Sequence, residues 1–464
     1  MTQIEQCDIL VLGSGESGKY LAWTTAKAGR HAVVIERALI GGSCPNVACL
    51  PSKNIIYSAH LAALFRRAHE FGISAGEISV DMNGVRNRKR KMVDDLVEIH
   101  RKNYTSSGAE LVMGEGRFVA PTTIEVNLRD GGTKVFNGER VYLNVGTRAA
   151  IPDIPGLQQS RPLTHVEALE LDNVPDHLIV LGGGDVGLEF AQPMRRFGSR
   201  VTMVERASQL AGREDSDVAK ALMQRFSEEG IDVELDARPI KVEGHCGDKL
   251  SFHVATPSGT RVIKGSDILV AAGRMANTQG IGLDTAGIEL DARGYVKVNE
   301  RLETTAKGVW AMGDCAASPQ FTHVAFDDFR IIRDNLNGGQ RSTAGRIVPY
   351  CMFTDPELGR GRPERSRGTP RRRAVSCGQG RDGSGVANTH AVGDARLSQG
   401  AHRHRQRSHT RFCRLGRGRR RTDRRRANGD ACGAPVHDTA RQHPDAPDDR
   451  RRLDGAFCKR TCFA

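Results

Sequence analysis

Two glycine-rich segments, about 170 residues apart, most constrain the fold of this 464-residue chain. The first, CDILVLGSGESGKYLAWTTAKAGRHAVVIER at residues 7–37, combines an apolar strand pattern, a glycine turn, a helical pattern and a second strand pattern. The second, HLIVLGGGDVGLEFAQPMRRFGSRVTMVER at residues 177–206, repeats that order. Strands that alternate with helices are typical of parallel sheets. The chain is therefore predicted to be an α/β protein with two such units.

The glycines of both segments have the spacing G-x-G-x-x-G and directly follow the first strand pattern. They are Gly13, Gly15 and Gly18 in the first segment and Gly182, Gly184 and Gly187 in the second. An acidic residue, Glu36 or Glu205, closes the next strand pattern. Such glycines let the backbone approach a pyrophosphate at a helix N-terminus, and the carboxylate accepts a hydrogen bond from a ribose hydroxyl. A single motif also fits a tight turn without a ligand, but two complete copies predict two dinucleotide sites.

The basic character of the chain comes from its last part. The net charge is +13, yet residues 361–464 hold 26 Lys+Arg and 10 Asp+Glu, whereas residues 1–360 hold 42 and 45. The charge therefore predicts no specific nucleic-acid site, and a basic run at residues 86–104 is typical of a solvated helix face. No apolar run reaches the roughly 18 residues that a membrane span needs, and the N-terminus lacks a signal-peptide pattern. We expect a cytoplasmic protein, whose thiols are kept reduced.

Two of the eleven cysteines, Cys44 and Cys49, lie close together in GGSCPNVACLPSKN at residues 41–54. Three chemistries fit such a pair: half of a zinc site, a structural disulfide, or a dithiol that opens and closes during catalysis. Zinc fits poorly because structural sites need two further ligands and no second pair lies nearby. A structural disulfide framework fits poorly in a reducing compartment. This segment alone does not decide among the three.

The order of these parts resembles the class I pyridine nucleotide-disulfide oxidoreductases, the family of dihydrolipoamide dehydrogenase, glutathione reductase and mercuric reductase. The matching segments lie between about residue 7 and residue 360, and they include GGSCPNVACLPSK, LNVGTRAAIPDIPGL, VAAGRMANT and GVWAMGDCAASPQFTHVAFDDFR. The resemblance implies two Rossmann-like dinucleotide-binding domains, one for FAD and one for NAD or NADP. The implied domains are the N-terminal part of the FAD domain at 1–150, the NAD(P) domain at 151–272, a second FAD-binding or central part at 273–345, and the remnant of a dimerisation domain at 346–464.

By the same resemblance, electrons pass from the reduced nicotinamide through FAD to a Cys44–Cys49 disulfide. Cys49, nearer the flavin, is then the charge-transfer thiolate, and Cys44 is the interchange thiol that meets the substrate. Lys53 and Glu189 match a catalytic pair beside the flavin, where the lysine stabilises developing negative charge. The implied substrate is a small-molecule or small-protein disulfide, or a metal ion, and no resident metal site is implied.

The resemblance also implies further contacts to the cofactors. Asp314 is expected to hydrogen-bond the ribityl or diphosphate region of FAD. Other implied contacts, besides the glycines and carboxylates of the two repeated motifs, are at Gly42, Ser43, Lys53, Gly146 and Gly273.

NAD is favoured over NADP, because the carboxylate of Glu205 accepts from a free 2′-hydroxyl and repels a 2′-phosphate. Arg206 is adjacent, so NADP stays open. Two residues depart from the family pattern at the nicotinamide site. Asp185 stands where relatives often have a bulky or apolar residue, and Pro193 lies inside the expected helix, where a proline costs about 3 kcal/mol. Both are expected to weaken nicotinamide binding without changing the fold.

Residues 361–464 do not resemble the dimerisation domain of the family. Leu, Ile, Val and Phe make up 10 of these 104 residues, and 25 of the 26 basic residues are arginine. This composition predicts a disordered tail, and it is expected of GC-rich DNA read out of frame. Codons can be chosen for residues 361–366 so that a one-nucleotide shift reads V-G-L-N-E, the usual continuation in the family. The same frame over residues 442–459 can yield a His-Pro-Thr segment, so we interpret the tail as a frameshift product.

This tail leaves two functions open. One is an FAD-dependent disulfide oxidoreductase similar to dihydrolipoamide dehydrogenase or mercuric reductase. The other is an inactive or diaphorase-only product that binds FAD without physiological turnover, because the catalytic histidine of the family lies in the missing segment. The homodimer that the family implies also depends on the domain that the tail replaces.

Overall fold

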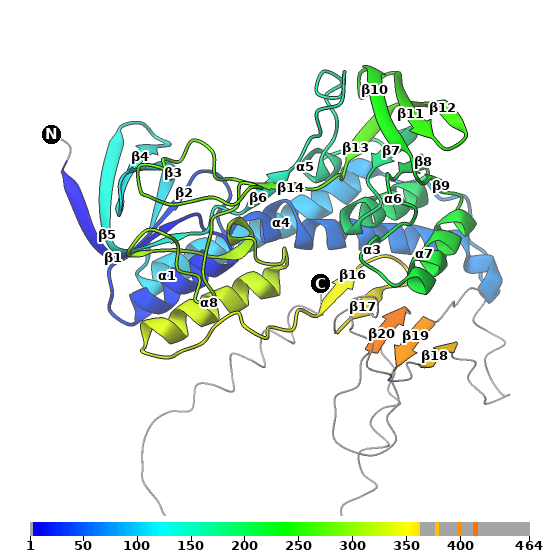
Figure 1. The fold of residues 1–464 in the computed structure, drawn as a ribbon. Coiled ribbons are helices and arrows are strands. Elements are labelled where there is room, and N and C mark those ends of the chain that lie inside the picture. Colours follow the sequence, from blue (N-terminus) through cyan, green and yellow to red (C-terminus); the bar gives the residue numbers. More distant parts are fainter. Residues whose placement is uncertain (1–2, 362–375, 380–396, 401–411, 416–464) are drawn as a thin grey trace, which may run out of the picture.

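The computed structural model describes residues 3–361, 376–379, 397–400 and 412–415 (Figure 1). Two sheets lie at opposite ends of the described body. Two long helices, α3 (Cys49–Arg66) and α4 (Met82–Ser107), run between them. This arrangement agrees with the predicted α/β class. Each sheet belongs to one unit, and the two helices connect the units.

The first sheet contains five strands from the first 143 residues and one strand, β15, from near residue 310. Its strands are β1 (Ile4–Leu12), β2 (Ala32–Glu36), β3 (Glu110–Ala120), β4 (Thr123–Leu128), β5 (Thr133–Leu143) and β15 (Val309–Ala311). β1 is parallel to β2 and β5, β2 is parallel to β3, and β15 is parallel to β5, while β3, β4 and β5 form an antiparallel meander. Every residue of β2 is buried, as expected for a parallel strand covered on both faces.

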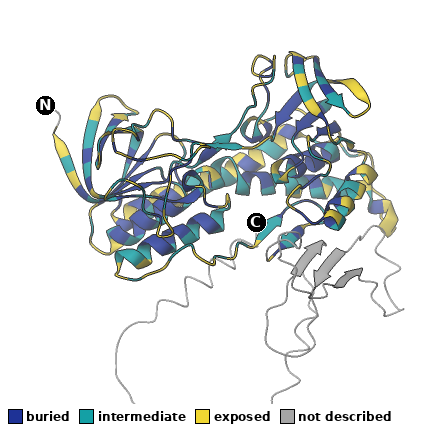
Figure 2. Ribbon diagram, in the orientation of Figure 1, coloured by how far each residue is buried: buried dark blue, intermediate teal, exposed yellow. Residues whose placement is uncertain are grey.

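Two helices cover one face of this sheet, α1 (Glu16–Lys27) and α8 (Thr322–Leu336). Leu21 of α1, Val34 of β2 and Phe329 of α8 belong to one buried cluster. Residues more than 300 positions apart in the chain therefore form a single core, and Figure 2 shows the strands beneath these helices as buried.

The second sheet contains four parallel strands in the order β13-β7-β8-β9. These are β7 (His177–Leu181), β8 (Arg200–Val204), β9 (Asp232–Glu234) and β13 (Asp267–Val270), with helices α5 (His165–Ala168), α6 (Asp185–Phe197) and α7 (Ser216–Glu228) in the same unit. An antiparallel meander of β10 (Arg238–Gly244), β11 (Leu250–Thr256) and β12 (Gly259–Gly265) precedes β13. Ile55 of α3 belongs to the core of this unit, so α3 joins the two units.

Short elements connect these parts. β6 (Thr147–Ala149) and β14 (Arg274–Ala276) pair antiparallel where the chain passes from one unit to the other and back. The remaining short helices are α2 (Ser43–Asn46), η1 (Ala68–Phe71) and η2 (Gly313–Ala316).

The basic run predicted as a solvated face lies within α4, and three of its charges pair with carboxylates outside this helix. Lys89 is only 1% exposed and forms an ion pair with Glu170. Arg90 binds the same carboxylate at 2.8 Å, and Arg86 lies 3.6 Å from Asp172. The expectation of a uniformly solvated face is therefore wrong at Lys89, because the carboxylate of Glu170, in the turn after residue 168, reaches it.

The end of the described chain forms a separate antiparallel sheet. β16 (Tyr350–Met352) and β17 (Leu358–Arg360) make a hairpin, which β20 (Phe412–Leu415), β19 (Leu397–Gly400) and β18 (Ser376–Gln379) extend. The other residues of 361–464 lie outside the described residues, so the disordered tail and the missing dimerisation domain stay predictions. Within the part of the chain that is described, no helix is long and apolar enough to cross a membrane.

Candidate active site

A cavity of about 3300 Å³ is lined by residues of both units. Pockets for drug-sized ligands are roughly 300–1,000 Å³, so this cavity has room for two dinucleotides. Most of the predicted site residues line it: Gly13, Gly15, Glu36, Gly42, Ser43, Cys44, Cys49, Lys53, Gly146, Gly184, Glu189, Glu205, Gly273 and Asp314. The fold thus gathers residues that are about 300 positions apart in the sequence.

Three predicted cofactor glycines, Gly18, Gly182 and Gly187, are not among the residues that line the cavity. A Cβ on Gly18 would lie 2.5 Å from the carbonyl oxygen of Gly13, and one on Gly187 would collide with the carbonyl oxygen of Gly182. These glycines let the first turn of each helix pack on the strand before it. They shape the two loops, and their predicted contacts with a cofactor stay predictions.

Asn144, at the end of β5, fixes the first glycine loop and was not singled out from the sequence. Its Oδ1 accepts from the Gly18 N–H at 2.9 Å, and its Nδ2 donates to the Met312 carbonyl at 3.0 Å. Gly13 has φ +101°, and a Cβ there would collide with the Asn144 carbonyl oxygen. The signal in the sequence is a polar residue directly after a buried strand, in LNVG.

Glu36 closes β2 and lines the cavity, but the chain itself already uses its carboxylate. Oε2 accepts from the amide and hydroxyl of Ser14 at 2.9 and 2.7 Å, and Oε1 accepts from the amides of Ala38 and Leu39 at 2.8 and 2.9 Å. A carboxylate has about four acceptor positions. A ribose hydroxyl would therefore have to displace the Ser14 hydroxyl, which is the one of these donors that can rotate.

Asp314 follows β15 and brings a partly buried carboxylate to the cavity. The hydroxyl of Thr147 donates to its Oδ2 at 2.8 Å, and Arg274 Nε in turn donates to Thr147 Oγ1 at 2.8 Å. Burial raises the pKa of Asp314, while the Thr147 hydroxyl and Arg274 oppose that rise. A desolvated carboxylate of this kind favours further hydrogen-bond donors, such as the hydroxyls of a ligand.

The two cysteines lie on adjacent helices within hydrogen-bond reach of each other. Cys44 is in α2 and Cys49 is the first residue of α3, with Pro51 in its first turn, where a proline is tolerated. A hydrogen bond from Cys44 lowers the pKa of Cys49 to about 6, with help from the positive charge of Lys53 and against burial. The same hydrogen bond and burial raise the pKa of Cys44 well above its usual value. These opposite shifts favour the thiolate form at Cys49 and the protonated form at Cys44.

Thr322, the first residue of α8, also touches this pair and was missed in the sequence. Its Oγ1 lies 3.2 Å from Cys49 Sγ. With Cys49 ionised, the threonine hydroxyl is the donor and stabilises the thiolate. The contact joins residues 273 positions apart, so no local pattern could reveal it.

Lys53 and Glu189 form the predicted pair across the junction of the two units. Lys53 Nζ in α3 lies 2.6 Å from Glu189 Oε2 in α6, and the Phe353 amide donates to Glu189 Oε1 at 2.8 Å. The lysine also lies 4.6 Å from the centroid of the Phe353 ring. Burial disfavours its charge, but Glu189 and Cys49 outweigh that effect and raise the pKa of Lys53. Lys53 is thus a cation beside the cysteine pair.

The second glycine loop leads into α6, and Glu205 closes the next strand as predicted. Its Oε2 accepts from the Gly183 amide at 2.6 Å and its Oε1 from the Ala207 amide at 2.8 Å. Two of the about four acceptor positions of this carboxylate are left for a ligand. Arg206 is exposed and is not among the residues lining the cavity.

Helix α6 continues through Pro193, and the first residue of this helix, Asp185, lines the cavity. A proline at this position removes the hydrogen bond that its N–H would donate to the carbonyl of Glu189. Because Pro193 is buried and α6 still extends from Asp185 to Phe197, the fold is retained, as expected. Burial and the neighbouring Glu189 raise the pKa of Asp185.

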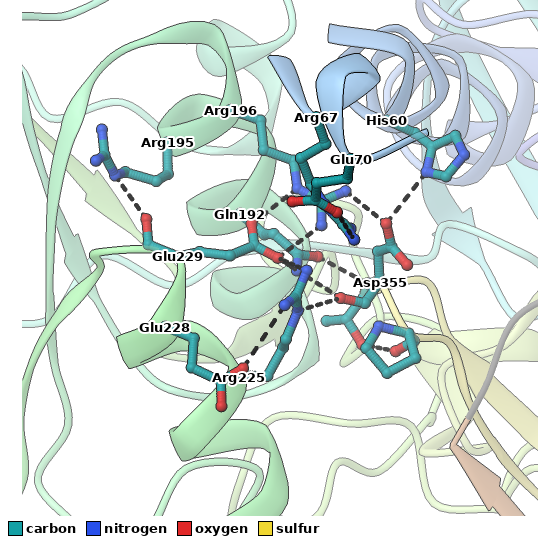
Figure 3. A network of polar contacts seen from close by, with 12 residues as sticks. His60, Arg67, Glu70, Gln192, Arg195, Arg196, Arg225, Glu228, Glu229 and Asp355 are labelled. Carbon is teal, nitrogen blue, oxygen red and sulfur yellow. Dashed lines mark hydrogen bonds and ion pairs between the residues drawn. The ribbon is translucent and has the colours of Figure 1, made fainter. Parts of the chain in front are cut away.

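A polar network around the buried Arg196 ties α3, α6 and the end of α7 to the segment after β16 (Figure 3). Arg196 binds Glu229 at 2.6 Å and Asp355 at 2.8 Å, and His60 Nδ1 lies 3.1 Å from the same Asp355 carboxylate. The side-chain amide of Gln192 pairs with the backbone N–H and C=O of Asp355 at 2.7 and 2.8 Å. The network therefore fixes the segment whose Phe353 contacts Lys53 and Glu189.

A family model described as "Pyridine nucleotide-disulphide oxidoreductase" matches residues 7–328. The chain belongs to this family. It is 34% identical over 356 residues to the probable pyridine nucleotide-disulfide oxidoreductase RclA of Escherichia coli, and these residues cover 76% of each chain. It is also 34% identical over 357 residues to a mercuric reductase of Streptomyces lividans, covering 76% of this chain and 74% of that one.

Solved structures agree with this membership. The HOCl-induced flavoprotein disulfide reductase RclA from Escherichia coli superposes with a TM-score of 0.76 at 29% identity, covering 88% of this chain and 89% of that one. The predicted family is thus confirmed, and so is its mixed α/β fold. Pyridine nucleotide-disulphide oxidoreductases of this kind use FAD and a pyridine nucleotide. The domain boundaries and the roles of the individual site residues stay predictions.

Proposed function

We propose that this chain transfers electrons from NADH through FAD to the Cys44–Cys49 pair and then to a disulfide or a metal ion. The observation that carries the proposal is the asymmetry of the two thiols. Cys49 has a pKa of about 6 and lies beside Lys53, whereas Cys44 keeps its proton. A pair in which one sulfur is stabilised as a thiolate while the other keeps its proton is suited to a disulfide that opens and closes by thiol–disulfide exchange.

The first glycine loop fits FAD. The N-cap residue of α1 is Gly15, which has no side chain to cap the helix and lines the cavity. Gly42 packs on it so closely that a Cβ would lie 2.6 Å from Gly15 Cα. Free amides at a helix N-terminus attract a pyrophosphate, and the Asp314 carboxylate suits the hydroxyls of a ribityl chain. FAD, when bound here, would carry two electrons from the nicotinamide to the cysteine pair.

The residues of the chain have distinct parts in this transfer. Lys53 places a positive charge beside the flavin site, where negative charge would develop when the flavin is reduced. Glu189 orients the lysine through their 2.6 Å ion pair. Thr322 hydrogen-bonds the Cys49 sulfur and stabilises its thiolate. We assign the exchange with the substrate to Cys44, which must first give its proton to a base, because Cys49 is the sulfur that Lys53 stabilises as a thiolate.

The acceptor belongs to one of two chemical classes. Relatives include a mercuric reductase, and one solved structure of RclA is a Cu(II) complex. Thiolates are soft ligands that suit such metal ions, and they also attack disulfides. A second candidate function is diaphorase activity alone. The Arg-rich residues 361–464, which contain no His-Pro-Thr segment, favour it.

Binding and reduction of FAD test the proposed function. The purified full chain, supplied with FAD, is expected to turn yellow and to bleach when NADH is added without oxygen. Absorbance at the flavin band measures both steps. A folded protein that stays colourless after reconstitution with FAD would contradict the proposal.

Glu205 is expected to set the choice between the two nicotinamide cofactors. The ratio of kcat/KM for NADH to that for NADPH should exceed one in flavin reduction. Glu205→Ala should lower this ratio about tenfold, since a hydrogen bond to a charged group contributes about 1.5 kcal/mol or more. Glu234→Ala, at the end of the neighbouring β9 and not among the residues lining the cavity, is the control. A wild-type preference for NADPH would show that another basic group dominates.

A further inference from the structure

Asp185 is a cavity-lining carboxylate that the electron path above does not use. It is the first residue of α6, one helical turn before Glu189. Side chains four positions apart share a helix face, so both carboxylates border the same part of the cavity. Glu189 is neutralised by Lys53 at 2.6 Å. In the described part of the chain, no ion pair involves Asp185.

The position of the nicotinamide ring follows from the proposed function, on which this inference rests. The N-cap of α6 is Gly184, which has no side chain, so the start of α6 is suited to the pyrophosphate of the nucleotide. Cys49 and the Lys53–Glu189 pair mark the flavin end of the cavity. A nicotinamide that reaches the flavin from the start of α6 must cross the helix face that carries Asp185 and Glu189.

The charge of the nicotinamide ring differs between its two redox states. The ring is neutral in NADH and carries a positive charge in NAD⁺. The charged groups that act on Asp185 are Glu189 on its own helix, Arg213 from the loop after β8, and Lys53 from α3. Glu189 forms an ion pair with Lys53, whereas Asp185 takes part in no ion pair among the described residues, and Arg213 reduces the strength of its negative field.

We propose that Asp185 is a specificity-determining residue that makes this site favour the cationic nicotinamide of NAD⁺ over the neutral ring of NADH. A carboxylate attracts the oxidised ring and has no such attraction for the reduced one. The site therefore stabilises the product of flavin reduction. One consequence is inhibition by NAD⁺, which must leave before the next NADH binds.

Nucleotide titrations of the FAD-loaded full chain test this inference without turnover. NAD⁺ is titrated into the oxidised protein and NADH into the fully reduced protein, so that no hydride is transferred in either case. Asp185→Asn should weaken NAD⁺ binding about tenfold and change NADH binding less than about twofold, a difference of the size expected for one partly screened charge. Asp185→Glu should keep the wild-type preference, because it retains the carboxylate.

Asp248→Asn is the matched control, because this exposed aspartate of the same unit is not among the residues lining the cavity. It should leave both dissociation constants unchanged. Equal weakening of NAD⁺ and NADH in Asp185→Asn would overturn the inference and show a role in shape alone. Wild-type protein that binds FAD but neither nucleotide would overturn the proposed electron source instead.

Discussion

Replacing Cys49 by serine is expected to abolish both disulfide-dependent turnover and the long-wavelength charge-transfer band, whereas Cys44→Ser abolishes the turnover and keeps the band. Turnover should fall at least about 1000-fold in both variants, because one thiol cannot complete an exchange. The band needs a thiolate against the flavin, and Cys49 is the cysteine that Lys53 and Thr322 stabilise as a thiolate. Reduction by NADH followed by absorption spectroscopy measures the band, and reduction of a disulfide substrate measures the turnover.

The pH dependence of the band tests the cause of the thiolate. In the two-electron-reduced wild type, the band should fade as the pH falls through about 6, because Cys49 then gains a proton. The largest influence that lowers this pKa is the hydrogen bond from Cys44. Cys44→Ala removes that donor, so the midpoint should move to higher pH. Cys44→Ser retains a hydroxyl donor, so its midpoint should lie between those of the wild type and the alanine variant.

Cys351 supplies the matched control for these variants. It also lines the cavity, on β16, but it does not belong to the hydrogen-bonded pair. Cys351→Ser should keep both the band and the turnover of the unmodified chain. If Cys44→Ser lost the band and Cys49→Ser kept it, the assignment of the two thiols would be reversed. If neither changed the spectrum, the pair would not lie beside the flavin.

The parts of the site that depend on local patterns could be predicted from the sequence. A glycine that must approach backbone closely, such as Gly13, leaves a signal in spacing, since it follows a buried strand and opens a helix. The same holds for Glu205 at the end of the next strand. Even so, the spacing did not distinguish glycines that line the cavity from those, such as Gly187, that let a helix pack on its strand.

Contacts between distant segments could not be predicted in this way. Asn144 and Thr322 act on residues 126 and 273 positions away, and each looks like an ordinary polar residue in its own segment. Lys53 and Glu189 were predicted only because the resemblance supplied their pairing. The buried position of Lys89 was missed because the charge run around it is polar on average, while the partner carboxylate of Glu170 comes from another segment.

The Arg196 network is expected to be the largest single polar contribution to the stability of the described body. The Arg196 side chain is 7% exposed, and its guanidinium donates to Glu229 at 2.6 and 2.8 Å and to Asp355 at 2.8 Å. Arg196→Met keeps most of the volume and removes the charge. It leaves two carboxylates, 12% and 13% exposed, with fewer partners, so the free energy of unfolding should fall by about 3–5 kcal/mol.

Arg195, the preceding residue of α6, is the control for this loss. Its guanidinium donates to the backbone carbonyls of Glu229 and Ser199 at 2.9 and 3.4 Å, so removing it strands no carboxylate. Arg195→Met should therefore cost only about 1 kcal/mol. Urea unfolding of the FAD-loaded chain compares the two, with an unchanged m value as the check that the same surface is exposed.

A compensating variant separates charge from packing in this network. If the cost of Arg196→Met comes from stranded charge, adding Asp355→Asn should recover part of it, because Asp355 then carries no charge and Glu229 keeps its ion pair with Arg225 at 2.9 Å. If the cost comes from lost packing, the double variant should be at least as unstable as Arg196→Met alone. Asp355 lies two residues after Phe353, which donates to Glu189, so disulfide turnover is measured in the same variants. If a compensated variant regains stability but turns over disulfide more slowly than the wild type, the network also holds the Lys53–Glu189 pair in place.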